Sequence, residues 1–220
     1  MRAGYYRVVM VDSPETTAAA LPWWRNPVNV VLCAVALLVS GFALGTFVPR
    51  GDDPTVHNAV DTGFLQDMRL HHEQAVTMAI VYRSIAATGS VLDPDLQTIA
   101  LEIHMEQGME TGRFVQLLRL FGEPESNESD QVMAWMGHSM PMDTMPGMAT
   151  DEQLRSLRDA RGAEADRLFA TLMIAHHEGG VEMARHAVDH AKNPEVIAMA
   201  RGMIKVQTGE IAELKRIAGV

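Results

Sequence analysis

The chain has 220 residues, a formal net charge of −10, a single cysteine and only 5% aromatic residues. One cysteine excludes a disulfide framework within the chain, and an acidic surface disfavours contact with phosphate backbones, so no nucleic-acid partner is expected. The abundance of alanine and methionine is typical of helices and predicts an all-α protein.

The amino-terminal region is predicted to attach the protein to the cell membrane. Residues 1–27 contain three arginines and three prolines and are interpreted as a short cytoplasmic tail. Residues 28–48 carry no charge and are long enough to cross a bilayer as one helix. The arginines before this span place the amino terminus inside and the rest of the chain outside the cytoplasm. An uncleaved anchor is therefore expected, and a cleaved secretory signal with Ala43-Leu44-Gly45 at its cleavage site is the alternative.

A linker at residues 49–60, rich in proline and glycine, is predicted to lead into an extracytoplasmic domain. Two helical hairpins are expected in that domain, at residues 61–125 and 151–220. The second helix of each hairpin has a clear start signal, because Asp93 and Asn193 are both capping residues that precede a proline.

The two hairpins begin with nearly the same sequence. Residues 61–79 (DTGFLQDMRLHHEQAVTMA) and 166–184 (DRLFATLMIAHHEGGVEMA) are identical at nine of nineteen positions. The second helices carry a weaker repeat, a Gln-x-x-Glu spacing at residues 107–110 and 207–210. Such similarity indicates an internal duplication. We therefore expect a four-helix bundle made of two copies of one hairpin.

The repeated segment is also the predicted metal site. At 100° per residue, the methionine and the two histidines of each copy lie on or beside the apolar face of a helix. Imidazole and thioether ligands suit copper, above all Cu(I), whereas zinc is an alternative for His and Glu. The predicted ligands are Met68, His71, His72, Met173, His176 and His177, with Glu73 and Glu178 as secondary candidates. The competing interpretation is that the imidazoles bind no metal and only hydrogen-bond facing helices.

A methionine-rich loop is predicted between the hairpins, at residues 126–150. Its prolines and glycine exclude a long helix, and its thioethers favour soft cations. It adds the candidate ligands His138, Met140, Met142, Met145 and Met148. In the alternative interpretation the loop folds over the bundle with its methionines inward. A short helix capped by Asp151 is expected at residues 151–160.

The remaining histidines are left out of the predicted site. His186 and His190 are four residues apart and share a helix face, but they have no counterparts in the first copy and are expected at the surface. His104 and His57 also lack counterparts in the duplicated pattern.

The doubled pattern Met-x-x-His-His-x-x-Ala-x-x-Met-Ala resembles that of the bacterial domain-of-unknown-function family 305. It reads MRLHHEQAVTMA and MIAHHEGGVEMA here, with Gly180 in place of the alanine. The resemblance covers about residues 55–218. It implies a ferritin-like four-helix bundle, usually exported or membrane-anchored, with copper binding in some members. Di-iron bundles use Glu-x-x-His, a spacing that the paired motifs do not form, which disfavours a ferroxidase or oxygenase.

Two functions remain open from the sequence. The first is a membrane-anchored, extracytoplasmic protein of copper binding and homeostasis. The second is a non-catalytic accessory or structural subunit of an envelope membrane complex, or a homo-oligomer, with Gly41 and Gly45 available for helix pairing. No Gly-x-Ser-x-Gly elbow is present, and the single cysteine lies in the apolar span, so the chain is not expected to be an enzyme.

Overall fold

The first unit of the structure is a single apolar helix. The computed structural model describes residues 22–47, 53–127 and 129–219, which belong to two units that divide after Gly51. In the first unit, helix α1 (Pro27–Phe47) follows a 3-10 turn at Trp23–Arg25. Its stretch Pro27–Gly45 has a mean hydropathy of 2.3 and the length to cross a membrane, as an anchor or a signal would. Most of the predicted cytoplasmic tail lies outside the described residues.

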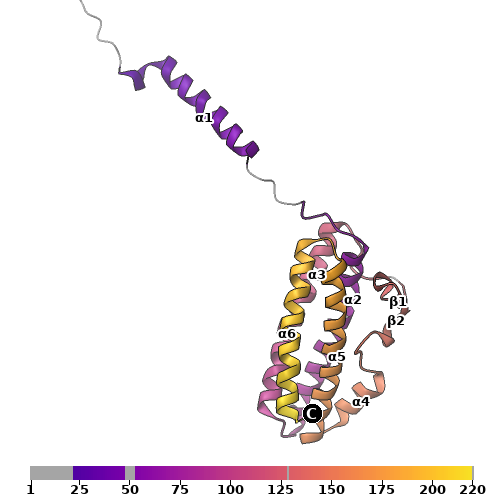
Figure 1. The fold of residues 1–220 in the computed structure, drawn as a ribbon. Helices are drawn as coiled ribbons and strands as arrows, with labels where there is room; N and C mark the ends of the chain where they lie inside the picture. Colours follow the sequence, from indigo (N-terminus) through magenta and orange to yellow (C-terminus); the bar gives the residue numbers. More distant parts are fainter. Residues whose placement is uncertain (1–21, 48–52, 128, 220) are drawn as a thin grey trace, which may run out of the picture. The chain divides into compact units, whose positions relative to one another are not determined.

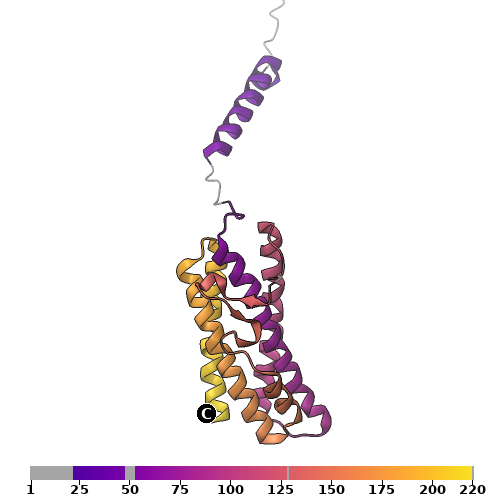
Figure 2. The ribbon, with the colours of Figure 1, turned by 90° about the vertical axis from the view of Figure 1, so that its right-hand side faces the viewer.

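The second unit is all-helical apart from one short β-ribbon. Its helices are α2 (Ala59–Ile85), α3 (Pro94–Phe121), α4 (Asp151–Asp159), α5 (Gly162–His190) and α6 (Pro194–Ala218). The four long helices lie side by side (Figures 1 and 2), with α2 paired to α3, α5 paired to α6, and α2 packed against α5. The prediction of an all-α protein is confirmed.

Local capping explains where these helices begin. The Asp93 and Asn193 side chains each accept hydrogen bonds from the next turn, as predicted. The sequence places the start of the first hairpin helix at about Thr55 or Asp61, and α2 starts between them at Ala59, because Asn58 forms a capping box with Asp61. The cap of α4 is Thr150 rather than Asp151, since the Thr150 hydroxyl accepts from the amide of Gln153.

The duplicated aspartates connect the two hairpins. Asp61 in α2 is fully buried and accepts a hydrogen bond from the backbone amide of Asn193 at 3.0 Å. Its counterpart, Asp166 in α5, accepts from the backbone amide of Asp93 at 3.2 Å and from the Tyr82 hydroxyl at 2.5 Å. Each hairpin therefore holds the turn of the other, through hydrogen bonds to a charged acceptor, which are stronger than neutral ones.

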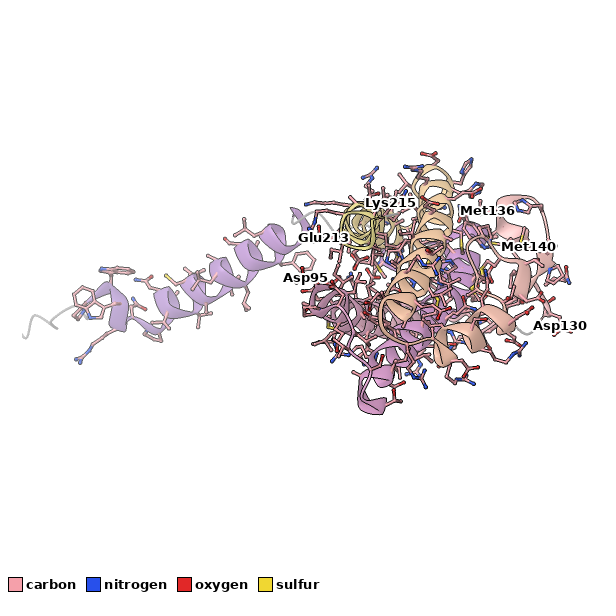
Figure 3. The ribbon with its side chains drawn as sticks, turned by 90° about the horizontal axis from the view of Figure 1, so that it is seen from below. Asp95, Asp130, Met136, Met140, Glu213 and Lys215 are labelled. Atoms are coloured by element: carbon pink, nitrogen blue, oxygen red, sulfur yellow. The ribbon has the colours of Figure 1, made fainter. Side chains whose placement is uncertain are left out.

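The segment between the hairpins folds onto α2 and α5. It contains an antiparallel ribbon of β1 (Gln131–Val132) and β2 (Met140–Pro141). Figures 1 and 2 place this ribbon on the side of the domain formed by α2 and α5. Figure 3 shows Met136 and Met140 on that side, away from Glu213 of α6. The segment is docked by Asp67, whose Oδ2 accepts from the Met133 amide and the Trp135 indole N–H, both at 2.8 Å.

Most loop methionines point inward. Met133 and Met145 are buried, Met140 and Met148 are half-buried against the core, and Met142 is 46% exposed. The structure thus favours the packing interpretation of the loop for all of these methionines except Met142. Burying each thioether stabilises the docked segment by on the order of 1.5–3 kcal/mol.

Candidate functional site

A buried polar layer crosses the middle of the helical domain. Along each long helix, the buried apolar residues belong to one hydrophobic cluster before a central polar position and to a second cluster after it. Six residues occupy these positions and are at most 4% exposed. They are His71 and His72 in α2, Gln107 in α3, His176 and His177 in α5, and Gln207 in α6.

His71 and His176 meet at the centre of this layer. Both side chains are fully buried, and their ring centroids are 3.7 Å apart with the rings inclined by 31°. The duplication explains the contact, because equal helical phase on two packed helices brings equivalent residues together. The histidines of both copies therefore lie in the interior of the domain, on the apolar faces where the sequence placed them.

His72 and His177 are held by carboxylates of their own hairpins. The Nε2 of His72 lies 2.8 Å from Glu110 Oε2, and the Nε2 of His177 lies 2.8 Å from Glu210 Oε2. A carboxylate only accepts, so each Nε2–H donates to it. Sequence reasoning gave Glu110 and Glu210 no role in the site, although their repeated spacing after a glutamine was the available signal.

The layer contains many polar atoms without hydrogen-bond partners. Nδ1 of all four histidines, Nε2 of His176, and Oε1 of both glutamines have none. His71 donates from Nε2 to the Pro146 carbonyl at 3.1 Å. A buried donor or acceptor left unsatisfied costs about 1–3 kcal/mol. The layer therefore lowers the free energy of unfolding, and its presence is better explained by a function than by stability.

Burial keeps the central imidazoles neutral. Burial, followed by the neighbouring His72, lowers the pKa of His71 to about 3. Burial and the neighbouring His71 also lower the pKa of His176 well below its ordinary value. A neutral imidazole with a free lone pair is the form that binds metal ions.

Methionines flank the polar layer on both sides. Met68 belongs to the same cluster as Met183, and Met173 belongs to the same cluster as Met78. Each cluster therefore contains the first methionine of one motif and the last methionine of the other. Sequence reasoning left Met78 and Met183 out of the candidate ligands, although both are identical between the copies.

Other predicted ligands lie away from the layer. Glu73 and Glu178 are surface residues that pair with Arg69 and Lys215, because one position after a buried histidine turns the side chain by 100°. His138 is exposed on the loop. The structure therefore does not bring these three residues together with the buried imidazoles.

The donor set fits copper better than zinc. Zinc prefers a group of three or four His, Cys, Asp or Glu side chains. Across the described residues, no three such side chains form a group that could hold a metal ion. What the layer offers is imidazole nitrogen with thioether sulfur on either side, a combination that suits Cu(I).

Glycines let the loop reach the layer. A Cβ on Gly179 would lie 2.1 Å from the Pro146 carbonyl oxygen, and Gly147 has a φ of +78° and sits against the backbone of His176. A Cβ on Gly180 would lie 2.5 Å from Gln207 Oε1. The position at which this sequence departs from the family pattern is therefore one where the glutamine of α6 approaches α5 closely.

The comparisons with known proteins give one family. The profile described as "Domain of unknown function (DUF305)" matches residues 61–218. A DUF305 protein from Streptomyces coelicolor is 34% identical, with a TM-score of 0.64 over 72% of this chain and 91% of that chain. A DUF305 fragment from Deinococcus radiodurans is 26% identical, with a TM-score of 0.60 over 74% of this chain and 97% of that chain.

A third similar structure contains copper. CopM in its Cu(II)-bound form is 28% identical, with a TM-score of 0.54 over 72% of this chain and 95% of that chain. CopM has also been solved in a Cu(I)-bound form. No curated protein matches the chain.

Proposed function

This chain belongs to the DUF305 family, and we propose that it is a membrane-anchored protein whose helical domain binds copper outside the cytoplasm. The similarity to CopM, which has been solved with Cu(I) and with Cu(II), supports the choice of metal. The observation that carries the proposal is the contact between His71 and His176, two neutral imidazoles buried with unpartnered nitrogens.

The unpartnered ring nitrogens distinguish a binding site from a structural contact. If the imidazoles only fixed the register of the helices, their nitrogens would be expected to find partners, as Nε2 of His72 and Nε2 of His177 do. His176 has both ring nitrogens unpartnered. A bound ion would take the lone pair of one of these nitrogens and would offset part of the desolvation cost that the apo domain carries.

The residues divide into two roles in this proposal. His71, His176, Met68 and Met173 supply the nitrogen and sulfur donors. His72 and His177 lie beside this pair, and each holds a carboxylate through Nε2–H, a contact typical of the surroundings of metal-binding histidines. Copper, when bound, supplies a soft Lewis-acid centre for these donors.

The amino-terminal helix supplies the anchor. Helix α1 is apolar along Pro27–Gly45, and Trp23 and Trp24 precede it, as is common at a membrane interface. Three arginines precede the span and one, Arg50, follows it closely, which favours an amino terminus in the cytoplasm. The DUF305 domain would then lie outside.

Cu(I) titration of the full chain in detergent tests the proposal. We expect the parent to withdraw Cu(I) from a chromophoric chelator stoichiometrically. The double variant Met68→Leu/Met173→Leu should bind at least about tenfold more weakly, because leucine keeps the volume and removes the sulfur. Met142→Leu, which changes an exposed loop methionine, is the matched control and should bind like the parent. Equal affinity in all three proteins would overturn the assignment of the motif methionines, and no binding by the parent would overturn the function.

A further inference from the structure

A second histidine cluster lies at the end of α5, outside the buried layer. The rings of His186 and His190 are stacked, with centroids 4.1 Å apart and an interplanar angle of 18°. His190 is exposed and His186 is half-buried. Two imidazoles one helical turn apart are a recurrent metal-binding arrangement, but the sequence alone did not favour one here.

The hydrogen bond of His190 leaves a lone pair available. Nδ1 of His190 lies 3.0 Å from the His186 carbonyl oxygen. Because a carbonyl only accepts, Nδ1–H donates, and Nε2 carries the lone pair. The half-buried ring of His186 stacks on this ring. A backbone carbonyl holding one nitrogen while the other is presented outward is the usual outer-shell arrangement of a metal-binding histidine.

The docked loop carries a third imidazole. The indole ring of Trp135 packs edge-on against His186, with centroids 5.4 Å apart, and Asp67 fixes this indole on α2. His138 follows three residues later on the same loop and is exposed. Burial lowers the pKa of His186, and the charges of His190 and, to a smaller extent, His138 lower it further.

We propose that His186 and His190 form a solvent-accessible site for a divalent cation of the Cu(II), Ni(II) and Zn(II) class, with His138 as a neighbouring group that strengthens binding. The pair supplies two ligands and water fills the remaining positions, since the described residues contain no preassembled group of three. Cu(II) should bind most tightly, following the Irving–Williams order for nitrogen donors. The buried layer and its methionines take no part, so this site does not rest on the proposed Cu(I) function.

Trp135 gives a direct reading of the site. The chain has three tryptophans, so the background Trp23→Phe/Trp24→Phe leaves Trp135 as the single reporter. In the full chain in detergent, CuCl₂ should quench its emission, because paramagnetic Cu(II) on His186 and His190 would sit beside the indole. In that background, His186→Gln/His190→Gln should raise the Cu(II) concentration at half-quenching at least about tenfold, and His138→Gln should raise it by a smaller factor.

The controls separate this site from the buried one. His104→Gln removes a histidine elsewhere on the surface of the domain and should leave the quenching curve unchanged. Met68→Leu/Met173→Leu should also leave it unchanged, even if that variant loses Cu(I). Far-UV circular dichroism checks the fold, and the single variant His190→Gln, whose side chain is exposed, repeats the test if the double variant is unfolded. A curve for either histidine variant that superimposes on that of its background protein would overturn the proposal.

Discussion

Replacing His176 by leucine should stabilise the apo domain while it weakens copper binding. His176 is fully buried and both of its ring nitrogens lack partners. At about 1–3 kcal/mol for each unsatisfied group, less the lost contact with His71, we expect the free energy of unfolding to rise by about 2 kcal/mol. For a domain of this size that corresponds to about 4–8 °C in Tm.

His177 provides the matched control on the same helix. It is equally buried, but its Nε2 donates to Glu210. His177→Leu should lower the free energy of unfolding, because the lost hydrogen bond to the Glu210 carboxylate, about 1.5–3 kcal/mol, and the carboxylate left unpaired outweigh the removal of the single unsatisfied nitrogen, Nδ1. Two neighbouring histidines should therefore respond with opposite signs to the same substitution.

The assay is thermal and urea unfolding of the full chain in detergent, with a chelator present and again with Cu(I) added. The parent should gain stability with Cu(I) by mass action, and His176→Leu should gain much less. If apo His176→Leu is destabilised as much as His177→Leu, the His176 ring makes favourable contacts in the apo domain that outweigh its unpartnered nitrogens. The energetic case for a binding site would then fail.

Three further measurements follow from the same structure. The free energy of unfolding should fall as the pH drops below 6.5, because unfolded histidines take up protons there while the pKa of folded His71 is about 3 and that of His176 is also lowered. Each of these two groups contributes up to about 1.4 kcal/mol per pH unit. Urea midpoints that stay constant from pH 7 to pH 5 would contradict this. Tyr82→Phe should cost about 1.5–3 kcal/mol in urea unfolding through loss of the hydroxyl bond to Asp166, and an unchanged midpoint would show that the two hairpins are not coupled there. Gly179→Ala should destabilise the domain by about 1–3 kcal/mol, because its Cβ meets the Pro146 carbonyl. The control is Gly202→Ala at an exposed helical position, where a Cβ would have nothing within 4 Å, and it should stabilise the domain by up to about 1 kcal/mol. Equal urea midpoints for the two alanine variants would argue against close docking of the loop.

The helix starts that could be predicted are those set by adjacent residues. The pairs at 93–94 and 193–194 carry both the cap and the proline, so the sequence locates both helices. The start of α2 was located only to within the range 55–61, because its cap, Asn58, lies in a proline-containing stretch that resembles a linker. The convergence of His71 and His176 was predictable because a duplication fixes equal helical phase.

What the sequence could not supply are contacts between distant residues. Glu110 lies 38 positions from its partner His72, and the repeated Gln-x-x-Glu spacing marks this glutamate without showing which residue it contacts. The bond between Asp67 and Trp135 spans 68 positions, so the side on which the loop docks was unknown. The packing of the loop that carries His138 against His186 depends on that docking, and the sequence could therefore not predict it.

The segment from Met145 to Ala149 closes the domain over His71. Its side-chain ties are the bond from His71 to the Pro146 carbonyl and the two bonds between Gln74 and the Ala149 backbone. Displacing a helix would open the whole core, whereas displacing this segment breaks three hydrogen bonds and withdraws Met145. The speed with which solutes exchange with the interior is therefore governed by a local opening and can be tuned at Gln74 without altering the four helices.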